Sequence, residues 1–153
     1  MQTRILVQTK DFDINQELKL AEKYAANCGA IINFIGKVRG NDNPQQPLSH
    51  LYLTHMPEVT EHEISKIISQ AVHRWPISYA CVIHRIGKLS VGDQIVLVLT
   101  ASEHRDHAYQ ANRYIMDYLK TEAPFWKKEC FANGQEYWVE MKHSDQQHTQ
   151  SWQ

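Results

Sequence analysis

The sequence predicts an α+β fold with a mostly antiparallel sheet and about three helices. Helical and extended segments alternate only in part, and two pairs of extended segments are joined by short, hairpin-like links. No glycine-rich phosphate-binding motif follows any expected strand, which argues against the familiar nucleotide-binding folds. A chain of 153 residues, 42% of them hydrophobic, suits one domain over 1–153 with a polar tail at 143–153.

Strands are predicted where β-branched and aromatic residues gather between turn-forming residues. These segments are 4–9, 30–38, 50–55, 78–86, 94–101, 125–132 and 135–141. The fourth and fifth are expected to form an antiparallel pair. The last two are joined by Asn133-Gly134, the preferred pair for a two-residue hairpin turn. Counting back from such a turn places Lys127 opposite Glu140, an opposite-charge cross-strand pair.

Three helices are predicted from apolar residues that recur at helical spacing. Their N-terminal caps are Asp13 or Asn15 for the first, the capping-box pattern at 60–63 for the second and Ser102 for the third. The third helix is expected to end shortly before Pro124, because the proline ring disfavours helical geometry in the preceding residue.

The composition excludes several classes of function. A formal net charge of −1 gives no global electrostatic reason to bind nucleic acid or an anionic membrane, so any anion site has to be local. There is no run of about 18 apolar residues and no secretory leader, so a cytoplasmic protein is expected. Three cysteines without CxxC spacing favour buried, reduced thiols over a disulfide framework.

Two lysines flank the junction between the third helix and the next strand. Lys120 lies in the last helical turn, where its positive charge complements the helix dipole. This interaction stabilises the helix by roughly 0.3–1 kcal/mol. Lys127 has its own structural explanation as the partner of Glu140. The functional alternative is that Pro124 folds the strand back on the helix end. Both lysines would then flank one cleft and bind an anion or act as acid and base.

A basic strand end precedes a polar loop. Lys37 and Arg39 share one face of a strand with a two-residue period, and Val38 lies on the other. By themselves these charges fit a solvated edge strand. The loop that follows, 41–47, is rich in Asn, Pro and Gln and is predicted to be a mobile surface loop and a candidate lid.

The start of the third helix offers another candidate anion site. His104 and Arg105 follow Ser102 where free backbone N–H groups are expected, and such donors suit a phosphate. A capped helix with exposed polar residues is the alternative that this pattern alone favours. His104 and His107 do not form a zinc-helix motif, so no metal site is expected. His84 has no nearby third ligand and is expected to be an ordinary core or surface histidine.

Seven short motifs occur in a fixed order along the chain. They are Gly36-Lys37-Val38-Arg39, Ile83-His84-Arg85-Ile86-Gly87, Val91-Gly92-Asp93, Ser102-x-His104-Arg105, Met116-Asp117-Tyr118-Leu119-Lys120, Ala123-Pro124-Phe125-Trp126-Lys127 and Ser144-Asp145-Gln146-Gln147. With these motifs the chain, from about Ile5 to Trp152, resembles the large, catalytic subunit of molybdopterin synthase. The ordered set is far more specific than any one motif.

The resemblance implies a hammerhead-like α+β fold and a homodimer. Each end of that dimer binds a small ubiquitin-like sulfur-carrier subunit, which completes a heterotetramer. The carrier's Gly-Gly tail ends in a thiocarboxylate and enters the active site. Two sulfurs are delivered in succession to cyclic pyranopterin monophosphate, which becomes molybdopterin during molybdenum cofactor biosynthesis. No metal or organic cofactor is implied.

The resemblance also implies roles for individual residues. By matching motifs, Lys120 and Lys127 are the catalytic lysines of this sulfurtransferase. The residues implied to line or adjoin the substrate pocket are Lys37, Val38, Arg39, His104, Arg105, Lys128 and Glu129. Some of them are expected to act across the dimer interface.

Two other classes of function remain open on the residues alone. A non-catalytic binding module would use the same basic cleft to hold a phosphorylated ligand or a protein tail, without turnover. A metal-dependent hydrolase would require stoichiometric zinc, for which the residue spacing offers no support.

Overall fold

The computed structural model describes residues 1–139 and 143–153. In chain order its elements are β1 (Gln2–Gln8), α1 (Ile14–Tyr24), β2 (Ala30–Lys37), β3 (Leu48–His55), α2 (Val59–Arg74), β4 (Tyr79–Arg85), β5 (Gly87–Ser90), β6 (Gln94–Ser102), α3 (Arg105–Leu119), β7 (Phe125–Phe131), β8 (Glu136–Trp138) and α4 (His143–Gln150). The predicted α+β class is confirmed, with a fourth helix beyond the three expected.

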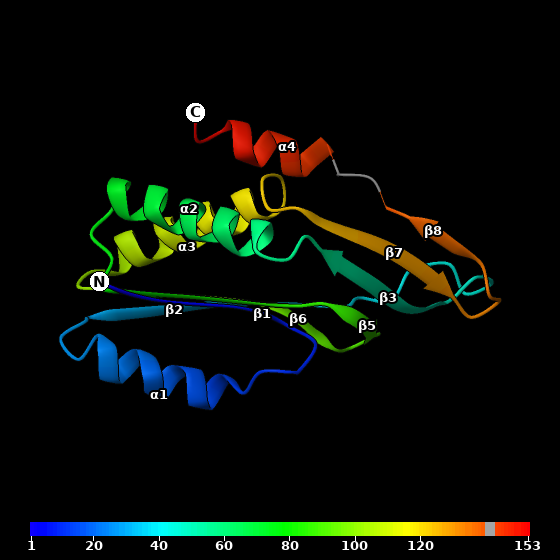
Figure 1. Cartoon of the computed structure of the whole chain (residues 1–153), viewed down its shortest axis with the longest axis horizontal. Helices are drawn as coiled ribbons and strands as arrows, with labels where there is room; N and C mark the ends of the chain where they lie inside the picture. Colours follow the sequence, from blue (N-terminus) through cyan, green and yellow to red (C-terminus); the bar gives the residue numbers. More distant parts are fainter. Residues whose placement is uncertain (140–142) are drawn as a thin grey trace.

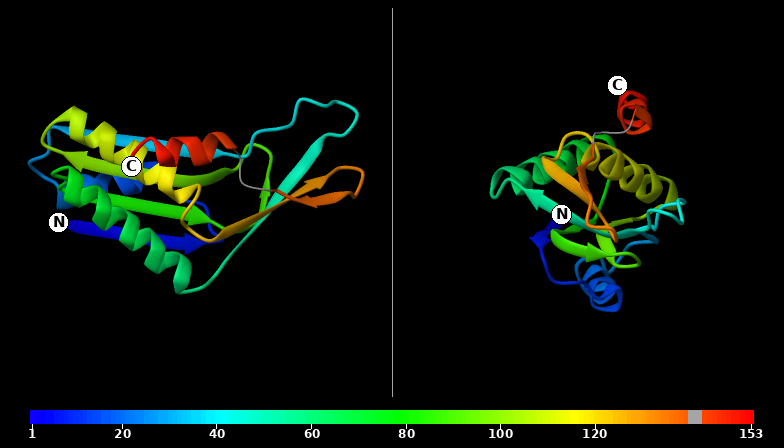
Figure 2. Two further views of the ribbon diagram at one scale, coloured as in Figure 1. Left: turned by 90° about the horizontal axis from the view of Figure 1, so that it is seen from above. Right: turned by 90° about the vertical axis from the view of Figure 1, so that its right-hand side faces the viewer.

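The described strands form two sheets, ordered β1-β4-β6-β2 and β5-β3-β7-β8. Within them β1 and β4 run parallel, and the other neighbouring strands are antiparallel. The predicted antiparallel pair is confirmed as β4 with β6. The link between them was expected to be a turn alone, but it contains β5, which pairs with β3 in the second sheet. The second sheet therefore extends from one end of the first (Figures 1 and 2).

Helices cover both faces of the first sheet. Figure 1 shows α1 on one face, with α2 and α3 on the other. The central strands alternate accordingly: Ala80 and Val82 of β4 pack with α2 and α3, whereas Cys81 and Ile83 pack with α1. Burying each such aliphatic side chain contributes about 1.5–3 kcal/mol, so these two layers supply most of the core.

The helix caps agree only in part with the sequence prediction. Asp13 caps α1, accepting a 2.9 Å hydrogen bond from the backbone N–H of Asn15. The capping pair predicted at 60–63 is wrong, because the N-cap of α2 is Glu58, two residues before Thr60. Glu61 accepts a 2.9 Å hydrogen bond from the N–H of Glu58, and Thr60 is buried inside the first turn.

Ser102 does not cap α3 as predicted. It is the last residue of β6, and its hydroxyl donates a 2.7 Å hydrogen bond to the carbonyl oxygen of Pro76. The N-cap of α3 is His104, which has extended backbone geometry and makes no capping hydrogen bond through its side chain. The Ser102 hydroxyl is therefore bonded to the carbonyl oxygen of Pro76 and does not cap the helix.

The hairpin that joins β7 to β8 has a three-residue loop. The N–H of Phe131 donates to the carbonyl oxygen of Gln135 (2.9 Å), and the N–H of Gly134 donates to the carbonyl oxygen of Phe131 (3.0 Å). Gly134 has φ 89°, a left-handed conformation that glycine adopts without strain. This is the turn followed by a left-handed residue that is typical of three-residue hairpins.

The longer loop shifts the hairpin register by one residue from the prediction. Lys128 lies opposite Trp138, and the N–H of Val139 donates a 2.8 Å hydrogen bond to the carbonyl oxygen of Lys127. The predicted register is therefore wrong, and Glu140, the expected partner of Lys127, lies outside the described residues. Of the strand predicted over 135–141, the described residues 135–139 contain β8, Glu136–Trp138.

The polar tail expected from residue 143 is instead a docked helix, α4. Thr149 is buried and its hydroxyl donates to the carbonyl oxygen of Asp117 on α3 (3.2 Å). Trp152 follows the helix, and its indole N–H donates to the carboxylate of Asp117 at 2.7 Å. Its ring also packs edge-on against Trp75 and Tyr114. The described part of the chain contains no helix long and apolar enough to span a membrane.

Candidate functional site

A cavity of about 450 Å³ lies where the first sheet, the end of α3 and the second sheet meet. The last residues of β2 and β4 and the first residues of β6 reach it from the same end of the first sheet. Strands β3 and β7 of the second sheet, together with the end of α3 and residues 120–124 that follow it, close it from the other sides. Elements that are distant in sequence therefore contribute to one site.

Lys120 and Lys127 both line this cavity, which confirms the predicted convergence. Lys120 is the C-cap of α3, and Lys127 lies on β7 opposite Leu53 of β3. Pro124 and the buried Ala123 fold the chain back between them. The same junction also presents Trp126 to the cavity, an aromatic surface with 45% exposure.

Lys37 adds a third cation at the end of β2. The pairing of β2 with β6 shifts after Gly36, because Lys37 pairs with Gln94 and leaves Ile95 as an extra residue. Bulges of this kind redirect side chains near functional sites. Here the irregularity lets Ile95 and Val96, which are neighbours in sequence, both line the cavity.

The charged residues of the cavity are mixed in sign but mainly basic. Three lysines lie on its wall, together with the carboxylates of Glu122 and Asp145. Asp145 comes from α4, so the helix that was expected to be a tail contributes to the site. Cations in a partly desolvated cavity act more strongly on an anion than they do in water. The arrangement suits a small ligand with one or more negative groups.

His84 also lines the cavity, although the sequence indicated an ordinary core or surface histidine. Its ring stacks on Phe125 with 3.8 Å between ring centroids and an 18° angle between the planes. Burial, with a smaller contribution from the charge of Lys120, lowers the pKa of His84 to about 4, so the ring is neutral at neutral pH. A signal in the sequence was its position at the end of a continuous apolar strand, next to a basic residue.

Val38 and Arg39 do not line the cavity. The strand ends at Lys37, so the two-residue period that placed Lys37 and Arg39 on one face does not continue. Val38 is buried in a small core with Leu51 and the other apolar residues beneath the second sheet. The guanidinium of Arg39 is exposed and binds the carboxylate of Asp42 at 2.8 and 3.0 Å.

The loop at 41–47 makes its contacts away from the cavity. The side chain of Asn41 donates to the carbonyl oxygen of Gln46 and accepts from the N–H of Leu48, which fastens the loop to itself. The carbonyl oxygen of Pro47 accepts from the N–H of Ala132 in the β7–β8 loop. None of the loop residues lines the cavity, so the predicted lid function stays a prediction.

His104 and Arg105 lie at the opposite end of α3 from Lys120. The helix has 15 residues, which corresponds to about 22 Å along its axis. One chain therefore does not bring these two residues to its own cavity. The rings of His104 and His107 are 6.5 Å apart, and within the described residues no group of three or more potential metal ligands occurs.

Lys128 and Glu129 adjoin the cavity residues in sequence but are not among the residues that line it. The ammonium of Lys128 lies on the face of β7 opposite Lys127, 3.1 Å from the carboxylate of Glu136 and above the ring of Tyr52. Glu129 pairs with Leu51 across the sheet. The roles implied for both residues stay predictions.

The fold and the cavity define a class of protein: an α+β chain with a lysine-lined cavity at the junction of its two sheets, suited to an anionic small ligand. The model of the MoaE protein family matches residues 7–122, and the chain belongs to this family.

Relatives extend this match over nearly the whole chain. The molybdopterin synthase catalytic subunit of Pasteurella multocida is 47% identical over 150 residues, 97% of both chains. That of Escherichia coli is 44% identical over 152 residues, 99% of both chains. Membership among catalytic subunits makes this chain part of an enzyme.

Solved structures agree with the fold. The molybdopterin biosynthesis MoaE protein from Burkholderia ambifaria superposes with a TM-score of 0.83 at 39% identity, covering 99% of this chain and 98% of the other. Molybdopterin synthase from Staphylococcus aureus gives a TM-score of 0.77 at 27% identity, covering 90% and 96%.

Proposed function

We propose that this chain is the sulfurtransferase subunit that converts cyclic pyranopterin monophosphate to molybdopterin. It takes two sulfurs in succession, one from the thiocarboxylated C-terminal glycine of each of two small ubiquitin-like carrier subunits. The observation that carries the proposal is the meeting of Lys120, Lys127 and Lys37, from three separate elements, on the wall of one cavity. The names of the relatives as molybdopterin synthase catalytic subunits support it.

The chemistry of the reaction calls for such a site. The carrier's thiocarboxylate and the cyclic phosphate are anionic, and further negative charge develops as the acyl–sulfur bond is broken. Preorganised cations in a cavity that excludes part of the water stabilise this charge. A lysine also serves as a proton donor or acceptor at the substrate side chain. We assign both functions to the Lys120 and Lys127 pair together.

The proposal includes a homodimer within a heterotetramer. Arg39, His104 and Arg105 lie outside the cavity of their own chain. In the dimer we assign them to the cavity of the second copy, where their charges meet the substrate phosphate. Lys128 and Glu129 are assigned to the rim near the carrier tail. No metal or organic cofactor takes part, and the reaction is expected in the cytoplasm.

The test is an anaerobic incubation of the purified chain with a thiocarboxylated carrier ending in Gly-Gly and with cyclic pyranopterin monophosphate. Product is measured by mass spectrometry as precursor with two added sulfurs. We expect turnover by the native chain and none by Lys120→Ala, which should still fold and bind the carrier.

Lys19→Ala is the matched control, because it makes the same truncation on an exposed residue of α1, on the other side of the first sheet (Figure 1). We expect this variant to keep native activity. If the native chain binds carrier and precursor tightly but forms no product, the chain is a non-catalytic binding module and not the sulfurtransferase. Full turnover by Lys120→Ala would refute the assignment of Lys120 as a catalytic lysine.

A further inference from the structure

Among the described residues of the cavity wall, His84 is the one buried titratable side chain that the proposed chemistry leaves without a role. It follows Ala80 and Val82 on the face of β4 that packs with α2 and α3. The residue is only 8% exposed. A core position of this kind ordinarily holds an aliphatic side chain, so an imidazole here calls for a partner.

One nitrogen of the ring already has such a partner. Nδ1 lies 2.9 Å from the backbone carbonyl oxygen of Arg85. A carbonyl oxygen only accepts, so Nδ1 carries the proton and donates it. In a neutral imidazole this leaves a lone pair on Nε2, the nitrogen farther from the backbone. The described residues supply no hydrogen bond to Nε2, and the ring lines the cavity.

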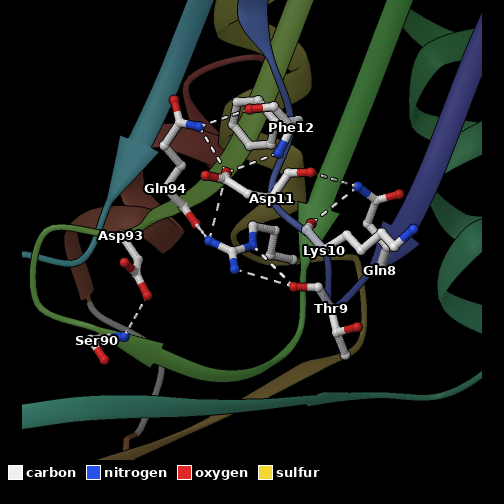
Figure 3. Close-up of polar contacts among 9 residues, drawn as sticks. Gln8, Thr9, Lys10, Asp11, Phe12, Ser90, Asp93 and Gln94 are labelled. Atoms are coloured by element: carbon white, nitrogen blue, oxygen red, sulfur yellow. Dashed lines mark hydrogen bonds and ion pairs between the residues drawn. The ribbon is translucent and has the colours of Figure 1, made fainter.

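The Arg85 carbonyl is itself held in place. The guanidinium of Arg85 donates to the backbone oxygens of Thr9 and Gln94, with the Asp11 carboxylate 3.7 Å away. Figure 3 shows this surrounding network, in which the Gln94 amide is directed at Asp11 and Phe12. Together with the stack on Phe125, it determines the orientation of the His84 ring.

The groups around the ring keep it neutral. Lys120 at the end of α3, His55 on β3 and Lys127 on β7 all oppose a positive charge on His84. Carboxylates of Glu122 and Asp145 line the same cavity and act in the opposite sense, but burial dominates. The wall therefore offers a fixed, uncharged hydrogen-bond acceptor between flexible ammonium groups.

We propose that His84 is a positioning residue: its Nε2 accepts a hydrogen bond from the ammonium of Lys120 and directs that charge at the bound anion. Lys120 is exposed at the helix end, so its long side chain has many rotamers without such an anchor. Lys120, at the C-cap of α3, lines the same cavity as His84, which lies near the end of β4. The inference rests on the proposed function for its catalytic consequence, but not for the contact itself.

The contact is tested by NMR on the full chain labelled with ¹⁵N in histidine and lysine. At pH 7 we expect His84 as the neutral tautomer protonated at Nδ1, and a slowly exchanging Nζ signal from Lys120. His84→Phe keeps the stack on Phe125 and removes the acceptor, so the Lys120 signal should broaden into exchange. A proton on Nε2, or an unchanged Lys120 signal in a folded His84→Phe chain, would overturn the proposal.

The consequence is tested in the sulfur-transfer assay. His84→Phe should lower the single-turnover rate on the order of tenfold to a hundredfold, with the KM for the precursor within about twofold. His84→Gln, which restores an acceptor, should recover most of the rate. An unchanged rate in His84→Phe would overturn the role. Absence of product from the native chain would instead refute the proposed function, while the NMR results would still decide the contact.

Discussion

The hydroxyl of Thr60, in the first turn of α2, donates a 2.9 Å hydrogen bond to the carbonyl oxygen of Pro124, 64 residues further along the chain. The hydroxyl oxygen of Thr60 also accepts a 3.0 Å hydrogen bond from the N–H of Met56. Thr60 is completely buried. Because Pro124 lies between the two lysines of the cavity, this single side chain links the start of α2 to the junction that brings Lys120 and Lys127 together.

Replacing Thr60 by valine should disturb both stability and turnover. Valine has nearly the same shape but leaves the Met56 N–H and the Pro124 carbonyl without their partner. We expect the free energy of unfolding to fall by about 1–3 kcal/mol. Turnover should fall as well, because the junction loses its anchor. Chemical denaturation and the sulfur-transfer assay measure the two effects.

Thr100→Val is the control for this variant. Thr100 is equally buried, and its hydroxyl donates to the carbonyl oxygen of Ala108 at 2.7 Å, far along α3 from the junction. It should lose similar stability and keep its turnover. Equal losses of turnover in the two variants would show that Thr60 has no particular link to the site.

A mixed dimer tests whether Arg105 acts on the cavity of a second copy. In a dimer of one Lys120→Ala chain and one Arg105→Ala chain, a trans arrangement leaves one complete site. We expect each parent dimer to be inactive and the mixed dimer to recover about half of the native activity per dimer. If both residues serve the same chain's cavity, mixing restores nothing.

Acid should destabilise the native chain through His84. Its pKa is 6.5 in the unfolded chain and about 4 when folded. Between these values the unfolded chain binds a proton that the folded chain does not, so stability falls as the pH falls. The loss amounts to roughly 3 kcal/mol at most. His84→Phe should show a flatter dependence between pH 6.5 and 4. Parallel curves for the two proteins in denaturation experiments would contradict the burial of a neutral His84.

Removal of the Trp152 ring should undock α4. The ring packs edge-on against Trp75 and Tyr114 with 5.5 Å between centroids, and Arg74 lies over it. We expect Trp152→Ala to lose about 3 kcal/mol of unfolding free energy. Trp138→Ala, on the exposed ring above Lys128, should lose about 1 kcal/mol or less. Similar losses in both would mean that α4 is held by other contacts.

Local features of the sequence predicted much of the fold and one part of the site. Apolar periodicity located the strands that form both core layers, and Pro124 correctly marked the turn that brings two lysines to one cavity. These features act between neighbours in sequence, where backbone sterics and side-chain spacing are sufficient. The seven motifs in their fixed order also indicated the protein family, because the ordered set is far more specific than any one motif.

The tertiary structure decided what depends on distant partners. A left-handed glycine lengthened the hairpin loop and moved the register by one residue. Ser102 donates its hydroxyl hydrogen bond to the carbonyl oxygen of Pro76 and therefore does not cap α3. The segment expected to be a polar tail is a docked helix, because the ring of Trp152 packs against Trp75. His84 became part of the site only because β7 placed Phe125 against it. In the last three cases a buried contact formed by a residue far away in the chain outweighed a local preference of about 1 kcal/mol, whereas the glycine acted locally through its backbone conformation.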